Sequence, residues 1–229
     1  MRPLLVLRPE PGNAETMARM RILGLMGHAF PLFAAEQVAW EAPSPNQFDA
    51  LLLTSANTVR FAGDGLDMLK SLPAYCVGEA TANAAQDAGF VVAYVGQSGV
   101  DELLASVPNK RLLHLCGEDR IDHAPPSSTI TALPCYRTAA LPPALGLFET
   151  LKQHPIAMLH SPRAARHFAQ LVDASLTPRS KIALCALSQN IADAAGVGWE
   201  AVAISPHPRD DEALKTAMSH FKLMPRPSE

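Results

Sequence analysis

Runs of apolar residues, each followed by a helical pattern, recur along almost the whole chain. Within a run the apolar residues mostly follow one another directly instead of alternating with polar ones, which is typical of strands covered on both faces. The pattern predicts strands at residues 3–8, 28–33, 49–54, 74–78, 91–95, 111–116, 156–160, 182–187 and 201–205.

Segments with helical spacing lie between the predicted strands. Residues 13–25 place Met17, Met20 and Leu23 on one face, and the alanine-rich residues 79–88 end at a glycine, which commonly follows the last turn of a helix. Further helices are expected at residues 101–107, 143–153, 163–172, 189–195 and 211–221. This alternation of strands and helices predicts a parallel α/β architecture.

Two stretches of the chain share one order of features. Residues 49–95 and 156–204 each contain a strand that ends at a serine, a helix, a strand with a central cysteine, an alanine-rich helix and a third strand. All βαβ units share part of this order, so chance similarity is the alternative explanation. We favour two related α/β halves.

Two proline-rich segments indicate where these halves are joined. Residues 36–47 contain a Pro-Ser-Pro cluster, and residues 122–143 hold two proline pairs around an extended segment, 129–141. One extended link leading out and one leading back indicate a discontinuous first domain with a second domain inserted between its two parts, and a cleft between two such domains would suit an anionic ligand. The expected first domain is residues 1–35 plus 142–229, the inserted domain is 40–130, and the linker segments are 36–39 and 131–141.

Composition narrows the class of protein. Nearly half of the 229 residues are hydrophobic and the net charge is −3, which supports a globular core and argues against a nucleic-acid binder. No apolar run is long enough to cross a bilayer and no leader is evident, so a cytoplasmic protein without a membrane partner is expected. The four cysteines contain no C-x-x-C pair and are interpreted as buried thiols in a reducing compartment, not as a metal site.

Candidate chemistry gathers where strands end, because ligands bind there in open parallel sheets. Nucleotide fingerprints such as G-x-x-x-x-G-K-[ST] and G-x-G-x-x-G are absent from the sequence. Free N–H groups at helix N-termini suit carboxylates or phosphates. The candidate anion-binding residues are Arg8, Ser55, Ala56, Asn57, Gly78, Thr81, Ser161, Arg163 and Ser188.

Each candidate has a plainer interpretation. The hydroxyls of Ser55 and Ser161 suit N-caps as well as ligands, and the same applies to Thr81 and Ser188. Tyr136 lies in the extended segment expected between the domains. It is interpreted either as a packing residue of a β segment or as a proton donor at the mouth of the cleft.

The chain resembles the uroporphyrinogen-III synthase family over nearly its full length. The resemblance rests on segments that occur in the family's order: LRPEPGNAETMARMRILGLMGHAFPLF, FDALLLTSANTVRFAG, AYCVGEATANAAQDAGF, LLHLCGEDR, CYRTAAL, MLHSPRAARHF and ALSQNIADAAGVGWEAVAISPHPRDDEAL. The resemblance implies two flavodoxin-like parallel α/β domains joined by a two-stranded β linker, with the active site in the cleft between them. It also implies cyclisation of hydroxymethylbilane to uroporphyrinogen III with inversion of the last pyrrole ring. The resemblance also implies that the protein uses no metal and no organic cofactor. The substrate of the family is a linear tetrapyrrole with eight carboxylates.

The resemblance also implies roles for individual residues. The family's tyrosine of the link region falls on Tyr136, its serines after equivalent strands fall on Ser55 and Ser161, and its G-x-A-T element falls on Gly78 and Thr81. The hydroxyl of the late loop falls on Ser188. Some members carry a glycine and paired threonines in that loop, where this chain reads Ala186-Leu187-Ser188-Gln189, so the resemblance supplies no second hydroxyl there.

The sequence also leads to expectations about partners and to one alternative function. We expect a monomer that receives its substrate by transient handover from hydroxymethylbilane synthase. The alternative is a non-catalytic two-domain module that binds a small anion, for example as a sensor.

Overall fold

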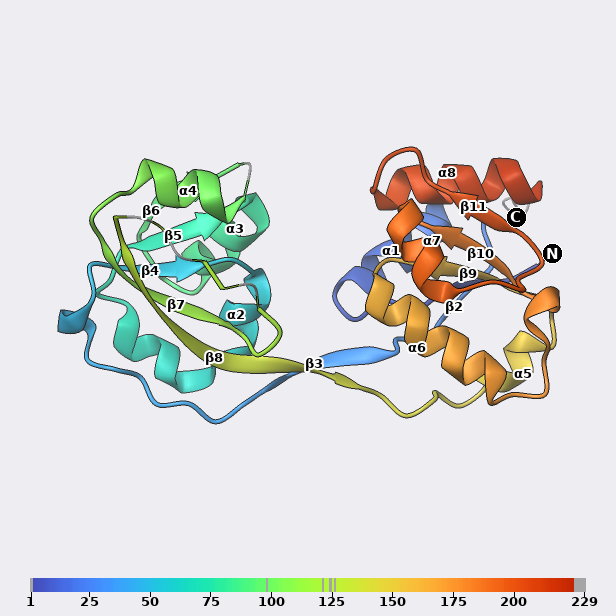
Figure 1. The fold of residues 1–229 in the computed structure, drawn as a ribbon, viewed down its shortest axis with the longest axis horizontal. Coiled ribbons are helices and arrows are strands. Elements are labelled where there is room, and N and C mark those ends of the chain that lie inside the picture. The colour runs from blue at the N-terminus through green and yellow to red at the C-terminus, as the bar shows by residue number, and fades with distance from the viewer. Residues whose placement is uncertain (1, 98, 121, 124, 126, 225–229) are drawn as a thin grey trace. The chain divides into compact units, whose positions relative to one another are not determined.

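The structure is a computed structural model that describes residues 2–97, 99–120, 122–123, 125 and 127–224 (Figure 1). The chain forms two compact units. Unit 1 comprises the residues up to Ala34 and those from Ala140 onward, and unit 2 comprises Ala35–Ala139. Met1 and residues 225–229, which belong to the expected first domain, lie outside the described residues.

Unit 1 is a parallel sheet with helices on both faces. Its sheet has the order β11-β10-β9-β1-β2 and every described strand pair in it is parallel. Numbered along the unit, this order is the 2-1-3-4-5 arrangement of flavodoxin-like folds. The elements are β1 (Leu4–Val6), α1 (Gly12–Ile22), β2 (Gly27–Ala29), α5 (Leu147–Leu151), β9 (Ile156–Leu159), α6 (Pro162–Asp173), β10 (Ala183–Ala186), α7 (Gln189–Ala195), β11 (Val202–Ile204) and α8 (Asp210–Phe221), with a short 3-10 turn at Arg179–Lys181.

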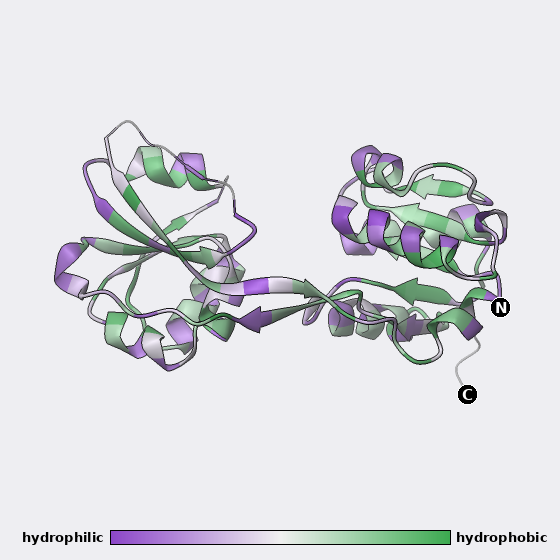
Figure 2. Cartoon of the chain, turned by 60° about the horizontal axis from the view of Figure 1, so that its bottom comes forward, coloured by the Kyte–Doolittle hydropathy of each residue, from purple (hydrophilic) through white to green (hydrophobic). Residues whose placement is uncertain are grey.

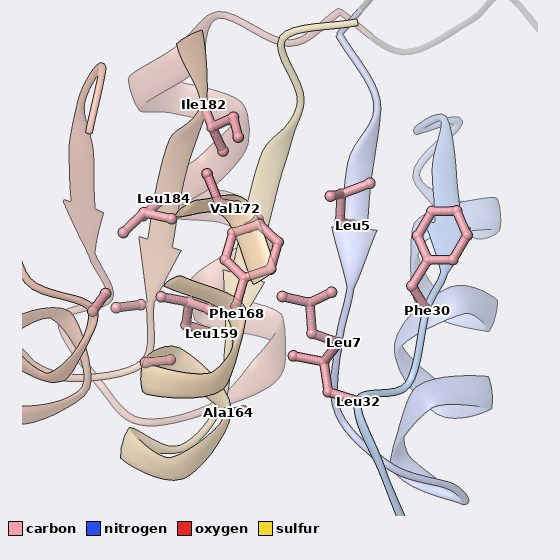
Figure 3. Packing of buried hydrophobic residues seen from close by; sticks show 14 of the residues in the cluster. Leu5, Leu7, Phe30, Leu32, Leu159, Ala164, Phe168, Val172, Ile182 and Leu184 are labelled. Atoms are coloured by element: carbon pink, nitrogen blue, oxygen red, sulfur yellow. The ribbon is translucent and has the colours of Figure 1, made fainter. Parts of the chain in front are cut away.

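The strands of unit 1 are apolar on both sides because both sides are covered. Leu5 and Leu159 face a core formed with α5, α6 and α7, and Figure 3 shows the Phe168 ring of α6 within it. Val6 and Met158 face the opposite core, formed with α1 and α8. The continuous apolar runs of the sequence therefore reflect burial of the strands on both faces of the sheet, as the pattern predicted. Figure 2 shows the strands as largely hydrophobic ribbons.

Unit 2 has the sheet order β3-β8-β7-β4-β5-β6. The helices α2 and α3 cover one face of this sheet, and α4 covers the other. The elements are β3 (Phe33–Gln37), β4 (Ala50–Leu53), α2 (Ala56–Phe61), β5 (Ala74–Val77), α3 (Glu79–Asp87), β6 (Val92–Gly96), α4 (Val100–Ser106), β7 (Arg111–Gly117) and β8 (Thr129–Ala140), with 3-10 turns at Pro45–Gln47 and Gly63–Leu69.

The two sheets are related by a change in chain order. If β7 and β8 are counted first and β4, β5 and β6 follow, unit 2 also has the 2-1-3-4-5 order, with β3 as an additional edge strand. The strands β4, β5 and β6 then correspond to β9, β10 and β11. These are the strands of the two similar stretches, 49–95 and 156–204, so the stretches occupy equivalent places in the two sheets.

Several predicted elements differ from the structure. The strand expected at 28–33 ends at Ala29, because Pro31 interrupts it, and a new strand, β3, starts at Phe33. The helix expected at 143–153 is reduced to Leu147–Leu151, since Gly146 before it has a left-handed φ of 88°. The remaining predicted helices and strands agree with the structure to within a few residues at their ends.

The two units divide the expected linker segments between them. Residues 36–39 and 131–139 lie within unit 2, because β8 pairs with β7 from Thr129 to Tyr136. Tyr136 was expected between the domains, and the structure places it in the sheet of unit 2. All four cysteines are buried, as predicted. None of the helices formed by described residues is both long and apolar enough to span a membrane.

Candidate active site

The carboxyl edge of the unit 2 sheet brings together residues that the sequence placed far apart. Strand order reverses between β4 and β7, which is the type of position where open α/β sheets bind ligands. Ser55 follows β4, Gly117 ends β7, and Tyr136 lies opposite Gly117 in β8. The Ser55 hydroxyl lies near enough to the Tyr136 phenol to lower the pKa of that phenol. Two of the candidate residues therefore meet at this edge.

The phenol of Tyr136 is held in a half-buried position. Its ring packs against the core of unit 2 and lies 6.3 Å from the ring of Phe61, centroid to centroid. Burial raises the pKa of the Tyr136 phenol, and the nearby Ser55 hydroxyl opposes that shift only in part. The phenol therefore keeps its proton at neutral pH and is available as a hydrogen-bond or proton donor.

Ser55 also starts the helix that follows it. Its Oγ accepts a hydrogen bond from the Asn57 N–H at 3.2 Å, so the N-cap interpretation holds for this serine. Ala56 and Asn57 form the first turn of α2. Behind them, the hydroxyl of Thr58 is buried and donates to the Leu115 carbonyl at 3.3 Å, which ties α2 to β7.

The second candidate element of unit 2 follows β5. Gly78 precedes α3 with φ 78°, a left-handed conformation that favours glycine, and an added Cβ there would meet no atom within 4 Å. Thr81 is only 4% exposed, so its side chain is mostly covered. The open space at this turn therefore lies over the Gly78 backbone.

Unit 1 carries Arg8, Ser161 and Arg163 at its own point of reversal, between β1 and β9. Ser161 caps α6 by accepting from the Ala164 N–H at 3.1 Å. The guanidinium of Arg163 lies 4.7 Å from the centroid of the Phe33 ring. Arg8 follows β1, and its guanidinium occupies the space beside Gly12 where a Cβ would otherwise lie.

Ser188 differs from the two capping serines. It stands before α7 in extended backbone, but its side chain makes no capping hydrogen bond. Its hydroxyl is therefore not used to start the helix. This difference makes Ser188 the candidate hydroxyl of unit 1 that is available to a ligand without loss of a cap.

Unit 1 contains a polar network around Asp210 that the sequence did not predict. The side chain of Asp210, which is 10% exposed, accepts hydrogen bonds from His160 at 2.9 Å, Thr16 at 2.9 Å and Arg19 at 2.8 Å. Arg8 lies 3.9 Å from the same carboxylate. Burial alone would raise the pKa of Asp210, but the hydrogen bonds from His160, Thr16 and Arg19 lower it overall.

Only the negative charge of the Asp210-Asp211-Glu212 segment was visible in the sequence, as a helix-start signal. The network itself joins residues as distant as Thr16 and Asp210, and no local pattern reports such a contact. Asp210 connects Arg8, a candidate anion-binding residue, to the start of α8. Its carboxylate therefore helps to fix the position of Arg8.

The candidates thus form one set in each unit. Unit 2 holds Tyr136, Ser55, Ala56, Asn57, Gly78 and Thr81, and unit 1 holds Arg8, Ser161, Arg163 and Ser188. No group of three or more His, Cys, Asp or Glu side chains suited to a metal ion occurs among the described residues.

Removal of either capping hydroxyl should cost stability more than activity. We expect Ser161→Ala and Ser55→Ala each to lower the free energy of unfolding by about 1 kcal/mol, because each leaves a helix N–H without its acceptor. Ser188→Ala is the matched control and should change the stability by less than about 0.5 kcal/mol, since Ser188 makes no cap bond. Urea unfolding of the three variants checks this; equal losses in all three would contradict it.

Comparisons with known proteins give a consistent result. A family model described as uroporphyrinogen-III synthase HemD matches residues 15–215. The structure resembles the uroporphyrinogen-III synthetase of Helicobacter pylori, with 19% identity and a TM-score of 0.67, over 96% of this chain and 100% of that one. It also resembles a mutant uroporphyrinogen III synthase of Thermus thermophilus, with 18% identity and a TM-score of 0.52, over 97% of this chain and 99% of that one. No curated protein sequence gave a significant match.

Proposed function

Because the chain belongs to the uroporphyrinogen-III synthase family, we propose that it cyclises hydroxymethylbilane to uroporphyrinogen III. The proposal that particular residues take part is supported by the Tyr136–Ser55 pair, which lies at the carboxyl edge of β4 and β7. The pair places a protonated phenol, held by packing and by a neighbouring hydroxyl, where α/β sheets bind ligands.

The reaction is a choice between two ring closures. Loss of the hydroxyl from the ring A hydroxymethyl group, as water, leaves an azafulvenium-like electrophile. Spontaneous closure joins it to the free carbon of ring D and gives the symmetric type I isomer. The enzyme instead directs the substituted carbon of ring D to the electrophile. The resulting spiro intermediate fragments, ring D closes again inverted, and a proton is lost as the ring regains aromaticity.

Tyr136 is proposed as the proton donor to the departing hydroxyl. Protonation turns hydroxide into water, a far better leaving group, and a positioned general acid typically accelerates such a step by about 10²–10⁴-fold. Burial raises the pKa of the Tyr136 phenol, so the donor form is fully populated at neutral pH. The phenolate left behind can recover the proton from solvent or from the ring that loses one.

The anion-binding candidates are proposed to hold the acetate and propionate groups. Arg8, Arg163 and the N–H groups near Ser161 and Gly78 suit carboxylates, and fixed donors restrict the conformations of a flexible chain. Control of geometry is sufficient for the isomer choice, because a preference of about 2.8 kcal/mol corresponds to roughly a hundredfold bias.

The decisive experiment is an isomer analysis. Purified protein is given freshly made hydroxymethylbilane, and the oxidised products are separated. We expect predominantly the type III isomer, formed faster than spontaneous closure. Type I alone at the spontaneous rate would instead identify a binding module for a small anion, the alternative class.

The setting of the reaction is also proposed. We infer a cytoplasmic monomer that takes its substrate from hydroxymethylbilane synthase by transient contact, which would limit spontaneous closure of the free substrate. The buried, unpaired thiols of the chain are compatible with a reducing compartment.

A further inference from the structure

The parallel pairing of β7 with β8 changes register at its last step. The register runs evenly from Arg111 opposite Thr129 to Cys116 opposite Pro134, and then Gly117 lies opposite Tyr136. One residue of β8, Cys135, is therefore extra. Such a bulge redirects the side chains that follow it, and bulges are over-represented next to active sites.

The extra residue changes the face on which Tyr136 lies. In a regular strand successive side chains point to opposite faces. Leu133 and Cys135 pack against the core beneath α2 and α3, and Tyr136 packs against the same core. The Sγ of Cys135 is fully buried and lies 3.6 Å from the Cys116 carbonyl. The bulge therefore turns the phenol to the side of the sheet on which α2 begins.

Gly117 supplies the space for the turned ring. A Cβ added to Gly117 would lie 2.9 Å from Cζ and 3.1 Å from the hydroxyl oxygen of Tyr136. The backbone cannot yield easily, because the Glu118 N–H donates to the Tyr136 carbonyl at 2.9 Å. Any side chain at position 117 must therefore displace the phenol itself, and with it the hydroxyl that lies near Ser55.

We propose that Gly117, together with the bulge at Cys135, is a positioning device that directs the Tyr136 hydroxyl toward Ser55 and the ligand-binding edge. The proposal rests on the role assigned to Tyr136 above. Gly117 acts through the phenol and makes no contact of its own with the substrate. It thereby helps to set the rate at which the enzyme forms the type III isomer, in competition with spontaneous closure to type I.

The test uses Gly117→Ala and a matched control. Gly65→Ala crowds another aromatic ring of unit 2 to a similar degree, since its Cβ would lie 3.0 Å from Cζ2 of Trp40, and neither residue belongs to the candidate site. We expect Gly117→Ala to slow formation of the type III isomer about fivefold and to raise the share of type I. The Gly65→Ala rate and isomer ratio should equal those of the wild type.

A double-variant comparison separates positioning from a general structural effect. If Gly117 acts through the phenol, Gly117→Ala should have little further effect in a Tyr136→Phe background. The same fivefold loss in both backgrounds, or in the Gly65→Ala control, would overturn the proposal. Wild-type protein that forms only type I would instead refute the proposed function, and an unaffected Tyr136→Phe variant would refute only the role of the phenol as donor.

Folding provides a second readout. If Gly117→Ala does not fold, as judged by circular dichroism, Tyr136→Ala is added to remove the ring that the new methyl group meets. Recovery of a cooperative thermal transition in the double variant supports the proposal. An equally unfolded double variant shows that Gly117 accommodates something other than the phenol and overturns it.

Discussion

Replacing Tyr136 with phenylalanine should slow formation of the type III isomer by at least about tenfold, a lower bound set below the typical contribution of a general acid, about 10²–10⁴-fold. The change removes one oxygen and keeps the ring that packs against the core. The rate loss should therefore occur without loss of secondary structure. A coupled assay that generates hydroxymethylbilane in place, followed by isomer separation, measures both the rate and the product ratio.

The serine variants provide the comparison for this result. Ser55→Ala removes the hydroxyl near the phenol but leaves the phenol in place, and Ser161→Ala changes only unit 1. Both should slow the reaction less than Tyr136→Phe does. Equal rates for the wild type and Tyr136→Phe would remove the phenol from the mechanism, while type III formation by the wild type would still stand.

Much of the fold follows from local sequence because burial on two faces leaves a local signal. Strands β4 and β9 are wholly buried, and their uninterrupted apolar residues predicted that environment. The serines that follow them cap helices, as a serine between an apolar run and a helical pattern indicates, although Ser188 in the same setting makes no cap bond. These features depend on neighbours in sequence, so the sequence alone reports them.

Other features depend on distant partners and leave no such signal. The bulge that turns Tyr136 exists only relative to the register of β7, and nothing within the segment PCYRT distinguishes a bulged strand from a regular one. Likewise, β3 is short and becomes a strand only because β8 lies beside it. The sequence therefore placed Tyr136 in an extended segment but could not say which face its ring occupies.

The order of strands shows the same limit. The similar stretches 49–95 and 156–204 were visible because each is continuous in the chain. The matching pairs β1–β2 and β7–β8 were not, since one pair precedes its three-strand partner in sequence and the other follows it. The complete correspondence between the two units therefore required the sheets themselves.

The largest effect on stability should come from the buried carboxylate of unit 1. Asp210→Ala should lower the free energy of unfolding of unit 1 by about 3 kcal/mol, because removal of one member of a buried ionic network leaves its partners uncompensated. Those partners are His160, whose side chain is 8% exposed, together with Arg19 and Arg8. Urea unfolding should be followed by Trp199 fluorescence in a Trp40→Phe background, since the chain has two tryptophans and Trp199 belongs to unit 1.

The next residue in the chain is the matched control, and pH distinguishes the two. Asp211 pairs with Arg209 on the surface and its pKa is lowered to about 2, yet Asp211→Ala should cost far less stability than Asp210→Ala because solvent screens the pair. The pKa of Asp210 is also lowered in the folded state, so its contribution is fully present above the ordinary carboxyl pKa of about 4. That contribution is lost as the pH falls through the lower pKa of the folded state. The gap in stability between the wild type and Asp210→Ala should therefore narrow in acid; a gap independent of pH would show that the network acts through packing and not through the charge of Asp210.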